Sequence, residues 1–231
     1  QRYIEKRGNF EKVADLFENS RRFSFGWYCE MEERDLSFES KKEFLNRILC
    51  DVPLHIHISL SSLKFSDVVI WLSSPMLSKS CFLDSKNRVL LTSDVLRDIG
   101  LKFDIYFDSE AGFFIFIDKN TPFDSEERKR IANSISDEGV HFERGLLFNN
   151  RAYVRCKYSF NGFTGFSVKK LNFGRVYTFF PYFDGEYVEV QIVKKIPPQL
   201  DLLDIDKITK GGKAKVTEKT AIFLISNGYA H

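Results

Sequence analysis

SDVVIWLSSP, residues 66–75, is a strand-like stretch in which five consecutive apolar residues end in two serines and a proline. Its polar and turn-forming flanks predict a buried strand over 67–73. Alternate side chains of a strand share a face, so Trp71 and Ser73 are expected to point the same way. Neither side chain binds a metal or moves a proton well. The stretch is therefore either an ordinary core strand or an active-site strand that lacks its active residues.

Before this strand, the spacing of apolar residues predicts two helices and further strands. The expected elements are a helix over 8–19, strands with a turn over 20–38, a helix over 40–49 and a strand over 53–60. Ser40, with Glu43 three residues later, has the pattern of a helix N-cap.

After the strand, the sequence predicts a connection rich in Ser, Lys and Asn over 73–88, followed by a short helix over 93–100. A strand pair over 102–118 turns around 109–112, and a helix over 125–135 begins with Ser125 at its cap. Strands dominate from residue 152, and the remaining expected elements are strands over 153–160, 163–171, 176–183 and 187–196 and a helix over 217–228.

Helices and strands are interspersed, with hairpins as well as crossovers. This order predicts a mixed α/β (α+β) fold with mixed or antiparallel sheets flanked by helices. At 231 residues, with no segment of linker composition, the chain is expected to form a single domain over 1–231.

Composition excludes several classes of protein. The net charge of +2 does not indicate a polyanion partner, and no apolar run is long enough for a membrane helix. The four cysteines lie far apart, without the paired spacing of a zinc site or a disulfide framework. We therefore expect an intracellular protein, of the cytoplasm or nucleoid, with no membrane partner.

Two sets of residues could hold a metal. Asp104 and Asp108 fall on one face of a predicted strand, and with Glu110 they could bind Mg²⁺ or Mn²⁺. An exposed strand end and turn explains the same residues without a metal. His55 and His57 also share a strand face, but no third zinc ligand is signalled, which favours a polar sheet face.

Taken in order, several segments resemble the small catalytic subunit of archaeal and eukaryotic DNA primases. The matching segments are SRRFSF, ERDLSFESKKEFLNRILCDVPLHIHIS, SDVVIWLSS, YFDSEAGFFIFID, NNRAYVRCKYSFNGFTGF and TEKTAIFLISNGYA. No piece is specific alone, but the ordered set is, and it runs from about residue 20 to the C-terminus. The resemblance implies the primase small-subunit fold, here without that family's zinc-knuckle insertion, because only a short loop with Cys81 is expected over 75–90.

The departures from the family pattern fall on its chemistry. Trp71 and Ser73 stand where the family has an acidic D-x-D pair, Phe114 stands for the motif histidine, and Asn149 stands for the third carboxylate. Asn161 and Phe163 replace the His and Lys of a nucleotide-cradling turn. The positions that survive include Arg155, Ser159 and Gly162.

The resemblance and its departures imply a primase-like replication protein that is not an enzyme. We expect no catalytic residues and no cofactor, a former cleft rich in aromatics (Trp71, Phe113, Phe114 and Phe163), and nucleotide or DNA contacts at Arg155, Ser159, Asn161 and Gly162. The expected partners are replication proteins, such as a primase large subunit or a DNA polymerase, and single-stranded DNA. Two alternatives stay open: an active primase with metals on Asp104, Asp108 and Glu110, and a plain single-strand binder that uses exposed aromatic and basic residues.

Overall fold

The computed structural model describes residues 2–17, 22–26, 33–51, 53, 55–60, 68–72, 79–109, 112–118, 123–148, 152–161, 164, 166–178, 186–196 and 211–231. Its helices are α1 (Arg2–Ala14), α2 (Lys41–Asp51), α3 (Lys79–Asp98), α4 (Ser125–Asp137), α5 (Arg144–Phe148), α6 (Phe173–Thr178) and α7 (Glu218–Ser226). Its strands are β1 (Phe23–Gly26), β2 (Glu33–Leu36), β3 (His55–Ser59), β4 (Val68–Leu72), β5 (Lys102–Phe107), β6 (Phe113–Asp118), β7 (Tyr153–Arg155), β8 (Lys169–Leu171), β9 (Tyr187–Gln191) and β10 (Lys213–Thr217).

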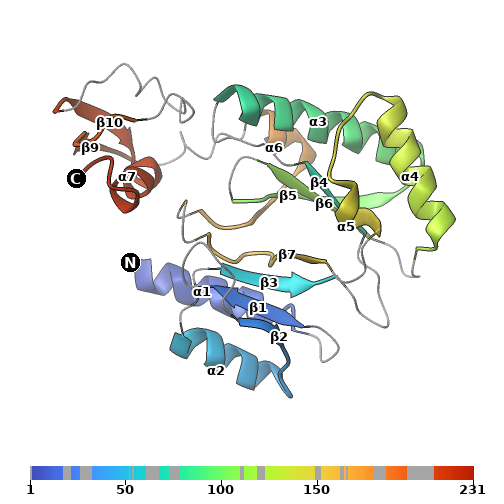
Figure 1. Ribbon diagram of the computed structural model, residues 1–231, viewed down its shortest axis with the longest axis horizontal. Helices are drawn as coiled ribbons and strands as arrows, with labels where there is room; N and C mark the ends of the chain where they lie inside the picture. Colours follow the sequence, from blue (N-terminus) through green and yellow to red (C-terminus); the bar gives the residue numbers. More distant parts are fainter. Residues whose placement is uncertain are drawn as a thin grey trace.

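Two four-stranded sheets form the body of the protein (Figure 1). Sheet I has the order β2-β1-β3-β7, and sheet II has the order β4-β6-β5-β8. Every strand pair within them is antiparallel. The late strands divide between the sheets, because β7 completes sheet I and β8 completes sheet II. The predicted α/β class with antiparallel sheets flanked by helices is confirmed.

Sheet II is buried on both faces, which explains the unbroken apolar sequence of β6. Ile115 and Ile117 pack into one core, with side chains from α3, α4 and α6. Phe114 and Phe116 alternate with them and enter a second core, which includes residues of α1, α2 and sheet I. A strand that serves two cores needs apolar residues at consecutive positions, and FFIFI provides them.

The C-terminal elements have a third core. β9 pairs with β10, and α7 packs against both, with Phe223, Val190 and Ile192 among the buried side chains. This hairpin and helix lie to one side of the two sheets (Figure 1). The expectation of one domain over 1–231 stays a prediction.

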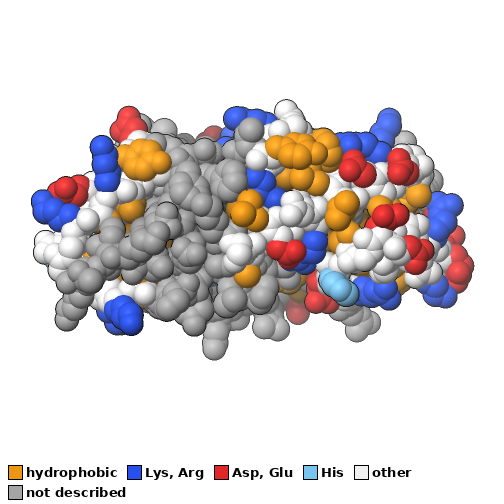
Figure 2. Space-filling view, turned by 90° about the horizontal axis from the view of Figure 1, so that it is seen from above, with side chains coloured by type: hydrophobic (Ala, Val, Ile, Leu, Met, Phe, Trp, Pro, Cys, Tyr) orange, Lys and Arg blue, Asp and Glu red, His pale blue; other side chains and the backbone are white. Residues whose placement is uncertain are grey.

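The charged surface is mixed. On the face shown in Figure 2, acidic and basic side chains are interspersed around α3 and α4, with a group of hydrophobic side chains near α3 and α6. Tyr177 on α6 and Leu91 on α3 are among the exposed large hydrophobic residues. No helix in the described parts of the chain is long and apolar enough to cross a membrane.

Several predicted elements differ from those in the structure. The first helix covers 2–14 rather than 8–19. The connection expected over 73–88, including the loop over 75–90, is largely helical, because α3 starts at Lys79 and runs for 20 residues. The strand expected over 176–183 is wrong where it overlaps α6, which continues to Thr178. The sequence reading also missed β10 and α5.

The helix caps were predicted in part. The backbone N–H of Glu43 donates to Ser40 Oγ at 3.2 Å, as expected, but the Glu43 carboxylate accepts from the N–H of Glu39 rather than of Ser40. The cap of α4 is Asp124 and not Ser125, since Asp124 and Glu127 form a reciprocal capping box.

Candidate functional site: a cleft between the two sheets

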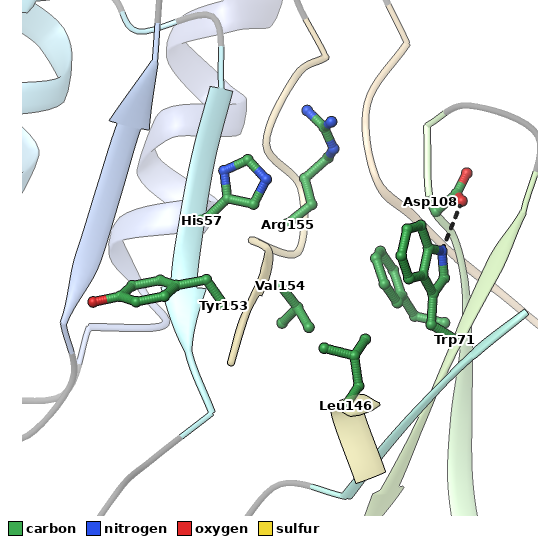
Figure 3. Close-up of a pocket in the computed structure, with 8 residues that line it drawn as sticks. His57, Trp71, Asp108, Leu146, Tyr153, Val154 and Arg155 are labelled. Carbon is green, nitrogen blue, oxygen red and sulfur yellow. Dashed lines mark hydrogen bonds between the residues drawn. The ribbon is translucent and has the colours of Figure 1, made fainter. Parts of the chain in front are cut away.

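A cleft of about 150 Å³ lies where the two sheets face each other (Figure 3). Sheet II contributes Trp71 from β4, Phe114 from β6 and Asp108 just after β5. Sheet I and its neighbours contribute the remaining lining residues, which are His57, Leu146, Tyr153, Val154 and Arg155. The resulting cleft has an aromatic wall on one side and a wall with Arg155 and His57 on the other.

The aromatic wall is built by strand register. Trp71 and Phe114 are direct cross-strand partners, and their rings stack with centroids 5.9 Å apart. The indole Nε1–H donates to Asp108 Oδ2 at 3.1 Å, which fixes the ring about its side-chain torsions (Figure 3). Trp71 is therefore held from two directions, by a ring behind it and by a carboxylate at its edge.

Asp108 is buried and bonded on both of its oxygens. While Oδ2 accepts from Trp71, Oδ1 accepts from the backbone N–H of Gly112 at 3.0 Å. The Asp108 backbone N–H also donates to the Gly112 carbonyl at 3.0 Å, which closes the turn between β5 and β6. Ser109 in this turn has a positive φ of 73°. The carboxylate thus stabilises the turn as well as the tryptophan.

The opposite wall brings Arg155 together with two histidines. His57 and Arg155 are cross-strand partners in the β3–β7 ladder. Arg155 Nη1 lies 2.8 Å from His55 Nδ1. Because a guanidinium has donors only, this Nδ1 accepts and the His55 proton sits on Nε2. This contact orients Arg155.

His57 is held neutral on the same wall, beside Arg155. Its buried Nδ1 has no hydrogen-bond partner among the described residues. Burial, reinforced by the charge of Arg155 and by His55, lowers the pKa of His57 from 6.5 to about 3. At neutral pH, the charge of this wall comes from Arg155.

Lys157, two residues beyond Arg155, extends toward the aromatic wall. Its Nζ lies 4.1 Å from the centroid of the Phe116 ring and 4.9 Å from that of Tyr106. This is a cation–π arrangement that links the late segment to sheet II. Burial, with Tyr158 and Asp104 nearby, raises the pKa of Tyr106, which keeps its hydroxyl neutral.

The structure brings five of the singled-out residues into the cleft: His57, Trp71, Asp108, Phe114 and Arg155. Phe113 was expected among the cleft aromatics, but it packs into the core on the other face of sheet II. The reason is strand alternation, since neighbouring residues of β6 point to opposite sides. Ser73, Glu110, Asn149, Gly162 and Phe163 lie outside the described residues.

Ser159 and Asn161 have structural contacts. Both are fully buried. Ser159 Oγ donates to the Cys156 carbonyl at 2.7 Å, and Asn161 Oδ1 accepts from the N–H of Thr164 at 3.3 Å. Thr164 Oγ1 in turn donates to the Ser109 carbonyl at 2.6 Å. This turn therefore braces the β5–β6 turn, and the expected nucleotide contacts of Ser159 and Asn161 stay a prediction.

Asp104 and Asp108 do not meet. Asp104 is exposed and pairs with Lys170 Nζ at 2.7 Å, whereas Asp108 faces the cleft. Four residues of strand separate them by roughly 13 Å, while two catalytic metals lie only about 4 Å apart. Within the described ranges, no group of three or more His, Cys, Asp or Glu side chains could hold a metal.

The sequence reading missed Tyr153 and Leu146 as cleft residues. A signal for Tyr153 existed, because it precedes Arg155 by two positions in a strand and so shares its face. Its hydroxyl donates to Asp35 Oδ1 at 2.5 Å, and burial and this bond raise its pKa to about 12. Leu146 lies on the short helix α5, which the spacing of apolar residues in the sequence did not predict.

Comparison with known proteins gives one sequence relative and a fold. No family model matches the sequence. The chain is 25% identical, over 271 aligned positions, to the DNA primase small subunit PriS of Sulfolobus acidocaldarius, and the match covers 85% of this chain and 82% of the relative.

The structure is similar to the polymerase domain of ligase D from Mycobacterium tuberculosis, solved in complex with DNA. The TM-score is 0.57 at 11% identity, with 74% of this chain and 81% of that chain covered. At this identity the likeness concerns the fold alone. The fold is that of the primase–polymerase domains, as the sequence resemblance predicted.

Proposed function

We propose that this chain is a primase-like DNA replication protein that does not itself catalyse nucleotidyl transfer. It acts as a structural or regulatory subunit of the replication machinery, in the manner of a pseudoenzyme. The sequence similarity to a primase small subunit and the primase–polymerase fold support the replication setting. The chemistry of the cleft supports the non-catalytic role.

The observation that carries the proposal is the Trp71–Phe114 stack at the centre of the cleft. Two-metal nucleotidyl transfer needs carboxylates that hold two ions on the attacking and leaving oxygens. An indole and a phenyl ring offer no oxygen ligand for such ions. The proposal therefore treats Trp71, Ser73, Phe114 and Asn149 as the replaced positions of a former centre.

Asp108 does not restore such a centre on its own. It is the one carboxylate among the described lining residues, and both of its oxygens already accept hydrogen bonds. No second carboxylate among the described lining residues is placed to share a metal with it. The proposal accordingly includes no cofactor.

The partners follow from the proposed role. A subunit of a primosome would hold a primase large subunit or a DNA polymerase, and it would act on or near single-stranded DNA. The similar protein from Sulfolobus acidocaldarius is a small subunit, which supports a companion subunit. Arg155 and its neighbours are the proposed points of contact with nucleic acid.

The test is primer synthesis and extension by the purified chain on a single-stranded template with labelled nucleotides, in Mg²⁺ and in Mn²⁺. An active primase run in parallel serves as the positive control. We expect no incorporation above the background of a preparation without the protein.

Two variants make the assay decisive. Asp108→Ala removes the cleft carboxylate, and Asp104→Ala removes the exposed one on the same strand. Metal-dependent incorporation by the wild type that vanishes in folded Asp108→Ala would overturn the proposal and support an enzyme.

A further inference from the structure

One face of the Trp71 ring is prepared for a planar ligand. Phe114 backs the indole, and Asp108 fixes its edge, while the side chain lines the cleft and is only partly buried. A ring immobilised in this way loses little further freedom when another ring stacks on it. Stacking of a nucleobase on an aromatic side chain needs no particular base, since every base has a π-face.

The opposite wall is suited to a phosphate. Arg155, at the end of β7, presents a guanidinium that is oriented by His55 and lines the cleft. Arginine recognises phosphate through paired N–H donors. His57, with a buried nitrogen that has no partner among the described residues, lies beside Arg155 and offers one more polar group.

The size of the cleft limits what it can take. Its volume of about 150 Å³ is below the roughly 300–1,000 Å³ of sites that enclose drug-sized ligands. The cleft has room for one ring rather than for a whole nucleoside triphosphate, and it is partly open to solvent. A chain molecule could insert one ring and leave the rest outside.

We propose that the cleft binds single-stranded nucleic acid without metal, with one base stacked on Trp71 and the adjacent phosphate held by Arg155. The residues that fill the centre of the cleft thereby become the binding surface. This inference rests on the proposed function, because a metal-dependent centre at the same place would need Trp71 displaced.

The binding test uses a Trp27→Phe protein, which leaves Trp71 as the single tryptophan of the chain. The probe is an oligothymidylate about 12 nucleotides long, titrated in EDTA while tryptophan fluorescence and the anisotropy of a label on the probe are followed. We expect quenching of Trp71 that parallels the anisotropy. Thymidine in place of the strand should quench far more weakly, since it lacks the phosphate that Arg155 would hold.

Two pairs of variants locate the site. Trp71→Leu should weaken binding about tenfold, while Trp71→Phe, which keeps a ring, should retain most of it. Tyr177→Leu changes an exposed aromatic on α6, outside the cleft, and should have no effect. Likewise Arg155→Ala should weaken binding, whereas Arg175→Ala, on the exposed side of α6, should not.

The outcomes separate this inference from the proposed function. Absence of binding in EDTA would overturn the proposed binding of nucleic acid in the cleft. Equal binding by folded Trp71→Leu and Trp71→Phe would overturn it as well. Neither result would contradict the proposal of a non-catalytic subunit. Binding of thymidine as tight as that of the strand also overturns the proposed binding, since the nucleoside has no phosphate for Arg155. Metal-dependent incorporation in the primer assay overturns the proposed function instead.

Discussion

At the scale of the residue, Trp71 and Asp108 form one hydrogen-bonded unit. The sequence pointed to each residue separately but not to the contact between them. The strand pattern placed Trp71 at the end of a buried strand, and the turn pattern placed Asp108 beside Gly112. The bond between them joins residues 37 positions apart, and local periodicity has no access to such a contact. The same limit explains why Asp104 and Asp108 looked like one site, since a shared strand face says nothing of the distance along it.

His57 predicts how stability depends on pH. Its pKa is 6.5 in the unfolded chain and about 3 in the folded one, so the unfolded state binds the extra proton between these values. The contribution of His57 is fully present above pH 6.5 and is lost as the pH falls toward 3. Between pH 6.5 and 5, we expect a loss of about 2 kcal/mol in the free energy of unfolding from this group.

Urea unfolding of the wild type and of His57→Asn across this range measures the effect. His141→Asn is the matched control, since His141 is exposed and far along the chain. The slope of stability with pH should flatten in the His57 variant only. An unchanged slope in folded His57→Asn would show that His57 is not buried as a neutral group.

At the scale of the element, periodicity identified most helices and strands, but not their ends. Helix α3 is the main exception, because Ser, Lys and Asn between 78 and 88 look like a loop. Tertiary contacts override that composition, since Phe82 and Val89 are buried in the core of sheet II. Helix α6 shows a second exception. Its last residues, 176–178, begin a stretch rich in aromatic residues that is typical of a strand, but they are helical.

The capping box of α4 gives a prediction at this scale. Asp124→Ala removes the side-chain acceptor for the N–H of Glu127, held at 2.7 Å, and should lower the free energy of unfolding by about 1 kcal/mol. Ser125→Ala, one position later and exposed, should change it by less than about half of that. Thermal or urea unfolding measures both, and equal losses would contradict the assignment of the cap to Asp124.

At the scale of the whole molecule, the described residues form three cores. Phe223 belongs to the C-terminal core of β9, β10 and α7, and Phe44 belongs to the core that includes sheet I. Phe223→Ala should lower the free energy of unfolding of the C-terminal core by about 3–5 kcal/mol. We expect faster amide hydrogen exchange in β9, β10 and α7, with β3 and β6 unchanged.

Phe44→Ala is the matched variant. It should accelerate amide hydrogen exchange more in β1 and β3 than in β9, β10 and α7. Uniform acceleration by either substitution would indicate one cooperative unit, as expected for a single domain over 1–231. The sequence predicted the fold class through the order of its elements, but its composition held no signal for a separate third core.

The β3–β7 ladder also sets an order of events during synthesis. Arg155 pairs with His57 only after nearly a hundred intervening residues have left the ribosome, and those residues include all of β4, β5 and β6. At about 5–20 residues per second, the edge of β3 waits roughly 5–20 seconds for its partner. The first three strands of sheet II, β4, β5 and β6, can therefore collapse on α3 and α4 while sheet I is still open, and β8 joins them later. The wall that bears Arg155 is the last part of the cleft to arrive, so a pause in translation after residue 148 would leave an exposed strand edge that a neighbouring chain could capture.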